Sequence, residues 1–142
     1  MVENKSFAPK GILRYREGDA LVPIAAGFRI ILNVVNTLGG WGRSFVVAIS
    51  KRWPRPELEY RNWWRSKLNF KLGEIQEITV QSDTSVINML AQEGLGPNKE
   101  GQPPARLDAL ALCLEKVAKL AKSTNSSIHC PRICCGLGGE TW

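Results

Sequence analysis

Long apolar runs and a secretory leader are absent from this sequence. The most apolar stretch, Ile24–Val35, contains Arg29 and Asn33 and is about half as long as a helix that spans a bilayer. The first residues, Met1–Lys10, have no apolar segment of the kind that a secretory signal needs. We therefore expect a cytoplasmic protein with no membrane partner.

Metal ligands are also scarce. His129 is the single histidine, and of the four cysteines only Cys130, Cys134 and Cys135 lie close together, while Cys113 belongs to a helical pattern. A zinc site usually needs paired cysteine arms or several histidines. We expect no metal and no other cofactor, and the simplest interpretation of the cysteines is reduced, partly buried thiols.

Catalytic groups are limited for the same reason. Neither a Ser-His-Asp set nor a carboxylate pair can be assembled around one histidine. His129 is a candidate acid or base, since an unperturbed histidine has a pKa of about 6.5, but the alternation over Ser127–Ile133 places it inside a strand, which favours a structural role. A nucleophilic Cys134 or Cys135 is a weaker alternative.

Length and composition indicate one domain over residues 1–142. The chain has 142 residues, 44% hydrophobic and 23% charged, which excludes a disordered or collagen-like chain. A total of 19 Lys and Arg against 13 Asp and Glu gives a net charge of +6. This excess of positive charge favours anionic partners.

Hydrophobic periodicity predicts alternating strands and helices. The run Arg29–Val35 is typical of a strand buried on both faces, and the clearest helix has its apolar face at Leu107–Ala121. The other expected elements are strands at Ile12–Tyr15, Glu74–Val80, Ser85–Leu90 and Ser126–Ile133, helices at Ser44–Lys51 and Glu57–Ser66, and a loop at Gly94–Pro104. This order predicts a three-layer α/β domain with a mostly parallel sheet.

Two glycine-rich segments follow predicted strands directly. Gly39–Phe45 follows the buried strand, and Gly136–Gly139 follows the last one. Ligands bind such sheets at the carboxyl ends of the strands, where glycine lets backbone N–H groups approach phosphate oxygens. The first segment matches neither a Walker loop nor a Rossmann fingerprint. Together the two loops favour a diphosphate ligand.

Individual residues near these loops have two readings each. Asp19 is a turn residue or an acceptor for an exocyclic amine such as that of adenine. Asn36 is a turn former or a partner for a ribose hydroxyl. Trp41, between glycines, is a packing residue or a stacking or lid residue, whereas Trp53, Trp63 and Trp64 fit helix packing.

The combination of these motifs resembles the macro domain family. The matching segments cover nearly the whole chain in order: Gly18–Ala20, Ile30–Asn36, Gly39–Phe45, Ile87–Gln92 and Pro131–Trp142. The likeness is greatest to small macro domains of phage and bacterial genomes that process ADP-ribose-1″-phosphate. It implies an α/β/α sandwich that binds ADP-ribose across one edge of the sheet.

The resemblance also assigns roles within the site. Asp19 would accept from the adenine amine and Ala20 would contribute its backbone. Asn36 would hold the distal ribose, and the two glycine loops would enclose the diphosphate from opposite sides. The implied ligand-binding residues are Asp19, Ala20, Asn36, Gly40, Trp41, Gly42, Arg43, Ser44, Phe45, Ile133, Cys134, Cys135, Gly136, Leu137, Gly138 and Gly139.

The chain departs from the family pattern at a few positions. Asn33 stands where relatives commonly have a candidate catalytic histidine, so Asn33, Asn36 and His129 are weak catalytic candidates. Ser44 and Cys134 replace glycines and add a Cβ where the backbone would touch ligand. Gly138 stands where the branch that removes ADP-ribose from protein carboxyl groups has Asp, which disfavours that reaction. The sequence ends at Trp142, before the family's last helix and strand.

Three functions remain open. The leading prediction is a hydrolase that releases phosphate from ADP-ribose-1″-phosphate. The alternative is a non-catalytic reader of ADP-ribose or of ADP-ribosylated protein. A basic RNA-binding module rests only on the +6 charge and on exposed aromatics, so a nucleic-acid partner is the least favoured.

Overall fold

The computed structural model describes residues 11–133 of the chain. In chain order the elements are β1 (Arg29–Asn36), α1 (Phe45–Arg52), α2 (Arg55–Ser66), β2 (Ile75–Gln81), β3 (Thr84–Gln92), α3 (Leu107–Thr124) and β4 (Ser127–His129). Proline opens α2, where Pro56 occupies the first turn and needs no N–H partner. Asn125, in the left-handed conformation, ends α3.

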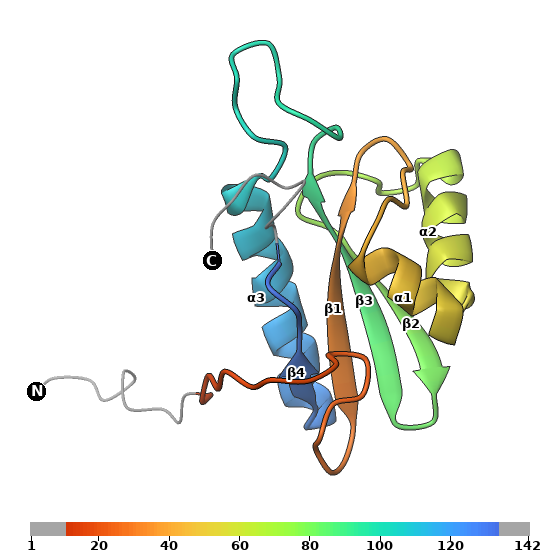
Figure 1. The fold of residues 1–142 in the computed structure, drawn as a ribbon, viewed down its shortest axis with the longest axis vertical. Helices are drawn as coiled ribbons and strands as arrows, with labels where there is room; N and C mark the ends of the chain where they lie inside the picture. Colours follow the sequence, from red (N-terminus) through yellow and green to blue (C-terminus); the bar gives the residue numbers. More distant parts are fainter. Residues whose placement is uncertain (1–10, 134–142) are drawn as a thin grey trace, which may run out of the picture.

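The four strands form one mixed sheet in the order β2-β3-β1-β4. Strand β1 pairs in parallel with both β3 and β4, while β2 and β3 form an antiparallel hairpin. The carboxyl ends of β1 and β3 therefore lie at the same edge of the sheet, which is uppermost in Figure 1. We call this the carboxyl edge and the opposite one the amino edge.

Helices cover both faces of the sheet (Figure 1). Helix α3 packs through Ala109, Cys113, Val117 and Ala121 against a cluster that includes Ile30 and Ile87. On the other face, α1 and α2 cover two smaller clusters, one containing Ile49 and one containing Tyr60. The predicted three-layer α/β/α arrangement is thus confirmed.

Two predicted strands differ in the structure. Residues 12–15 form no strand, because no neighbouring strand pairs with them, and Ile12, Leu13 and Tyr15 are largely exposed. The last strand is shorter than the predicted Ser126–Ile133 and pairs with β1 only over Ser127–His129. Pro131 lies just beyond it, and proline has no N–H to donate to a sheet.

The remaining element predictions agree with the structure to within a few residues. The dense aliphatic run becomes the central strand β1, and Gln81–Thr84 connects β2 to β3 as a tight turn. Among the helices within residues 11–133, none is both long and apolar enough to cross a membrane.

Candidate functional site

The first glycine loop begins at the carboxyl end of β1. The pairing of β1 with β3 shifts register between Val35 and Asn36, so the strand leaves the sheet through an irregularity. Thr37 then donates its N–H to the Gln92 carbonyl, and its hydroxyl accepts from the N–H of Gly94. The loop is therefore joined to the segment that follows the neighbouring parallel strand.

Asn36 organises the loop from inside. Its side-chain Nδ2 donates to the carbonyl of Gly40 at 2.8 Å, and its Oδ1 accepts from the N–H groups of Leu38 and Gly40 at 2.9 and 3.0 Å. Asn36 is 6% exposed. The structure places this amide in contact with its own turn, as the turn-former reading predicted, and next to the residues implied for the distal ribose.

Side chains of helix α2 pack against the loop. The Tyr60 hydroxyl donates to the backbone carbonyl of Asn36 at 2.5 Å and lies 3.2 Å from its Oδ1. Burial raises the pKa of Tyr60 to about 12, so the phenol stays protonated at neutral pH. Gly39 has a φ of +75°, and a Cβ at this position would meet the Trp64 ring at 2.5 Å. The approach of loop to helix thus requires glycine.

Trp41 is held between the two helices. Its indole Nε1 donates to the carbonyl of Val46 at 3.0 Å and to Oγ of Ser50 at 2.7 Å. Its ring lies 5.7 Å from that of Tyr60, and it is partly buried against two core clusters. These contacts correspond to the packing reading of Trp41.

The backbone N–H groups that follow Trp41 form a separate feature of the loop. The N–H groups of residues 42–45 have no hydrogen-bond partner in the part of the chain that the structure describes. Gly42, Arg43 and Ser44 are exposed, and Ser44 precedes α1 without a side-chain cap. Unpaired N–H groups at a helix start, beside an arginine, form a typical anion site.

Ser44 itself has an unusual backbone. Its φ of +65° and ψ of −115° lie in a region that side chains rarely adopt. The sequence places serine where the family pattern has glycine, and the structure retains the glycine conformation there. This local strain is the consequence expected of an added Cβ.

Asp19 and Ala20 lie in a turn beside the same cluster. Oδ1 of Asp19 accepts from the N–H of Leu21 at 2.9 Å, and its carbonyl accepts from the N–H of Val22 at 3.0 Å. Leu21 is buried in the cluster against which Trp41 and Phe45 pack. The Asp19 side chain is therefore fixed as a turn residue on the face of the sheet that carries α1.

Two of the catalytic candidates lie away from the loop. Asn33 is 3% exposed, and its Nδ2 donates to Oδ1 of Asn88 at 3.0 Å beneath the start of α2. His129 lies on β4 opposite Ile31, with Nε2 at 2.7 Å from Oγ of Ser127. Burial, and then the charge of Arg29, hold the pKa of His129 below its usual value. Of the three candidates, only Asn36 contacts the loop.

Most of the second glycine loop, Cys134–Gly139, lies outside the described residues. Ile133, which precedes this segment and is the first ligand-binding residue implied for this side of the site, is partly buried against the cluster beneath α3. Within residues 11–133, no three His, Cys, Asp or Glu side chains gather as a metal site would require.

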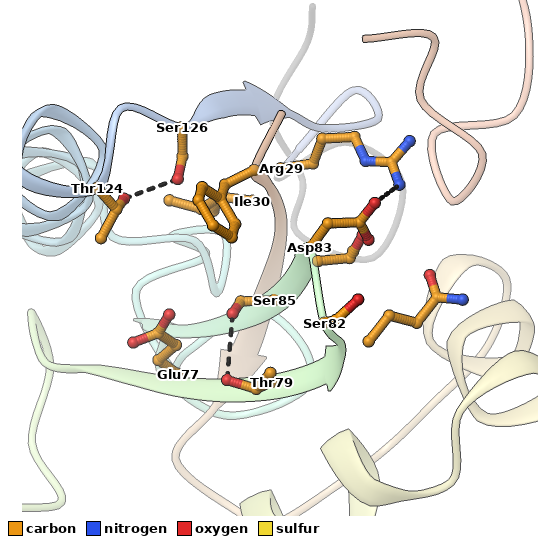
Figure 2. Close-up of a pocket in the computed structure, with 12 residues that line it drawn as sticks. Arg29, Ile30, Glu77, Thr79, Ser82, Asp83, Ser85, Thr124 and Ser126 are labelled. Carbon is orange, nitrogen blue, oxygen red and sulfur yellow. Dashed lines mark hydrogen bonds and ion pairs between the residues drawn. The ribbon is translucent and has the colours of Figure 1, made fainter. Parts of the chain in front are cut away.

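A hollow lies at the amino edge (Figure 2). It has a volume of about 300 Å³ and is lined by both hairpin strands, the start of β1 and the end of α3. Three pairs of its side chains interact: Arg29 with Asp83 at 2.8 Å, Thr79 with Ser85 at 3.5 Å, and Thr124 with Ser126 at 2.7 Å. Nε of Arg29 is buried and has no hydrogen-bond partner in the described chain. The predicted loop lies at the other edge of the sheet.

Sequence reasoning missed the supporting residues of α2. It predicted a helix at Glu57–Ser66 with Trp63 and Trp64 as packing residues, but not that Tyr60 and Trp64 contact the glycine loop. The polar residues Glu57 and Arg61 also went unnoticed, although Arg61 donates to the carbonyl of Gly39 at 2.9 Å. The available signal was the group of aromatic residues Tyr60, Trp63 and Trp64 among the polar residues of this helix.

The chain is similar to several solved structures. A protein of unknown function from Bacteroides thetaiotaomicron is 43% identical over 90% of this chain and 82% of its own, with a TM-score of 0.88. A macrodomain protein from Streptomyces coelicolor is 42% identical over 88% of this chain and 80% of its own, with a TM-score of 0.75. The DarTG protein of Thermosipho africanus, solved in complex with ADP-ribose, shares the fold at 16% identity over 81% of this chain and 32% of its own, with a TM-score of 0.63. No family model and no curated protein sequence matches.

Proposed function

The chain belongs to the macro domain family, and from this premise we propose that it binds ADP-ribose at the carboxyl edge of its sheet. The observation that carries the proposal is the series of backbone N–H groups at residues 42–45, which follow the central strand, lead into α1 and have no partner within residues 11–133. The fold is shared with a protein whose structure contains ADP-ribose.

The diphosphate is the part of the ligand that this loop suits best. Successive N–H groups and the start of a helix stabilise phosphate oxygens without a counter-charge that must be desolvated. The exposed Arg43 and the basic residues Lys51 and Arg52 at the end of α1 add to the attraction. The second loop, Cys134–Gly139, would face the other side of the diphosphate, as the resemblance implies.

The two ends of ADP-ribose would reach the neighbouring residues. Asp19 would accept from the adenine amine, with Ala20 beside it, because their turn packs against the cluster that holds Phe45. The distal ribose would lie over Gly40, Trp41 and Gly42. The Asn36 amide already forms hydrogen bonds within its own turn. We therefore propose that Asn36 stabilises the conformation of this loop and contacts the ribose from the buried side of the loop.

The reaction that we propose is hydrolysis of ADP-ribose-1″-phosphate. Water attacks the terminal phosphorus, the bond between phosphorus and the ribose oxygen breaks, and the products are ADP-ribose and inorganic phosphate. The loop N–H groups would stabilise the developing negative charge on the phosphoryl oxygens. The rate would come from positioning, because the chain offers no assured general base.

One observation favours a non-catalytic reader of ADP-ribose or ADP-ribosylated protein as the second candidate. Among the residues that the structure describes, none of the hydrogen bonds or ion pairs of residues 37–44 involves a histidine or a carboxylate. A reader would bind ADP-ribose at the same loop and would need neither a histidine nor a carboxylate there. Turnover separates the two candidates.

Titration calorimetry with ADP-ribose tests binding. The wild-type protein should release heat on titration, and Asp19→Ala should weaken binding about tenfold, because a charge-assisted hydrogen bond to adenine is lost. Equal affinity of the two proteins would exclude the adenine role of Asp19. Binding of RNA that falls steeply with salt, without binding of ADP-ribose, would instead favour the RNA-binding module.

Phosphate release from ADP-ribose-1″-phosphate tests catalysis. The expected result is slow release of phosphate, faster than in buffer alone. Free ADP-ribose should inhibit this release, because it competes for the same loop. Release no faster than in buffer, together with tight binding of ADP-ribose, would identify the protein as a reader.

A further inference from the structure

We infer that Glu57 of α2 is a positioning residue for the part of the glycine loop proposed to contact the distal ribose. This inference rests on the proposed function, because it assigns a role within the same site. The supporting observation is that the two carboxylate oxygens of Glu57 connect, through different partners, to two points of one glycine loop.

The first connection passes through α1. Oε1 of Glu57 accepts from the hydroxyl of Ser50 at 2.8 Å. Oγ of Ser50 in turn accepts from the indole Nε1 of Trp41 at 2.7 Å. Because the Ser50 hydrogen points to the carboxylate, its oxygen lone pairs face the indole. Glu57 therefore orients one of the two acceptors of the Trp41 indole, the other being the carbonyl of Val46.

The second connection stays within α2. Oε2 of Glu57 accepts from Nε of Arg61 and pairs with its Nη2, each at 3.0 Å. Nη1 of the same guanidinium donates to the carbonyl of Gly39 at 2.9 Å. The planar guanidinium thus meets the carboxylate and the loop at once, which fixes its orientation.

Both connections end on the surface proposed for the distal ribose. Gly39 and Trp41 flank Gly40, whose own N–H and carbonyl are held by Asn36. Glycine gives little intrinsic restraint to the backbone, so the positions of Gly39–Trp41 depend on these side chains. Residues 43–45, proposed for the diphosphate, make no hydrogen bond to Glu57 or Arg61 in the described chain.

The contribution of Glu57 to overall stability should be small. Its side chain is 32% exposed and that of Arg61 is 37% exposed, and ion pairs four residues apart on a helix surface stabilise proteins little. Loss of Glu57 should therefore change the relative affinities for ADP-ribose and ADP more than it changes the free energy of unfolding. The affinity for ADP-ribose should fall, while the affinity for ADP, which lacks the distal ribose, should not.

The experiment compares Glu57→Ala with Glu59→Ala. Glu59 is the matched control, because it lies on the same helix, carries the same charge and forms a surface pair with Arg55 also four residues away, at 3.7 Å. Dissociation constants for ADP-ribose and ADP are measured by calorimetry. Glu57→Ala should weaken ADP-ribose about five- to tenfold and ADP less than about twofold, in line with the loss of one or two hydrogen bonds. Glu59→Ala should change neither.

A second measurement does not depend on a ligand. Hydrogen exchange of the Trp41 indole N–H, followed by NMR, should become faster in Glu57→Ala, because one of its two acceptors, Oγ of Ser50, is released while the carbonyl of Val46 remains. Glu57→Gln, which keeps the side-chain shape, should restore part of the protection and serves if the alanine variant does not fold. It should also lie between wild type and alanine in ADP-ribose affinity.

The outcomes are separable. Unchanged indole exchange in Glu57→Ala overturns the inference, and so does an equal loss of affinity for ADP and ADP-ribose. If wild-type protein binds no ADP-ribose, the proposed function fails, and the inference fails with it as a statement about the ribose end. Faster exchange of the Trp41 indole N–H would in that case show that Glu57 orders the loop without a role in ligand binding, and this result contradicts the inference.

Discussion

The two edges of the sheet use their polar groups in opposite ways. At the amino edge several side chains around the hollow pair with one another, as the Arg29–Asp83 ion pair illustrates (Figure 2), although Nε of Arg29 is buried without a partner in the described chain. At the carboxyl edge the side chains of Asn36 and Tyr60 bond the inside of the loop, and the backbone N–H groups of residues 42–45 are left without partners in the described chain. A hollow alone does not indicate a site; unpaired donors on a supported backbone do.

The largest expected effect is at the contact between loop and helix. Gly39→Ala should destabilise the protein by about 3 kcal/mol, because the new Cβ meets the Trp64 ring and the residue has a positive φ. Gly101→Ala is the control, since Gly101 has a φ of +77° but open space around it, and should cost about 1 kcal/mol. Urea denaturation measures both. Equal losses would mean that the contact with Trp64 is not restrictive.

Tyr60→Phe should have the next largest effect. It removes the hydroxyl that donates to Asn36, leaving a buried carbonyl with one partner fewer, at a cost of about 1–2 kcal/mol. Because the pKa of Tyr60 is raised from 10.0 to about 12, the wild-type protein should also lose stability as the pH rises from 10 to 12. Tyr60→Phe should lack this alkaline loss. Urea denaturation midpoints of both proteins at about pH 8 and about pH 11 measure the difference.

Ser44→Gly should stabilise the protein. Relief of the strained backbone should contribute about 1 kcal/mol, and no side-chain cap is lost, since Ser44 makes none. Ser44→Ala separates the Cβ from the hydroxyl and should give no gain. Thermal unfolding of the two variants measures the difference; a gain of the same size in Ser44→Ala would contradict the role of φ.

The smallest effect on the proposed ligand site should come from the amino edge. Asp83→Asn should leave ADP-ribose affinity within about twofold of wild type, because distant sites act independently. The Thr84 hydroxyl, and then Arg29, hold the pKa of Asp83 below its ordinary value of 3.8. The stability that Asp83 supplies is therefore present above that value and is lost as the pH falls below it. Asp83→Asn should be less sensitive to acid than wild type in unfolding curves.

Much of the architecture was predictable because burial imposes periodicity. The aliphatic run Arg29–Val35 became the central strand, and the helical spacing of apolar residues over Leu107–Ala121 became α3. The buried face of this helix differs in part from the predicted one, because Ala109 and Cys113 are buried whereas Leu107 and Leu114 are exposed. The strand at Ile12–Tyr15 was wrong, because a short apolar run forms a strand only where another strand pairs with it. The position of the first glycine loop followed from the strand before it. The roles of Cys134–Gly139 stay predictions.

Composition and pattern by themselves determined the layered α/β fold, the family resemblance and the two loops that would approach an anion, because spacing of apolar residues and glycines is local information. Only the tertiary structure decided which side chains support the loop. Tyr60 and Arg61 lie more than twenty residues from the backbone carbonyls that they bind, and Glu57 acts on the loop only through a partner. Hydrogen bonds between distant segments leave no periodic trace in a sequence.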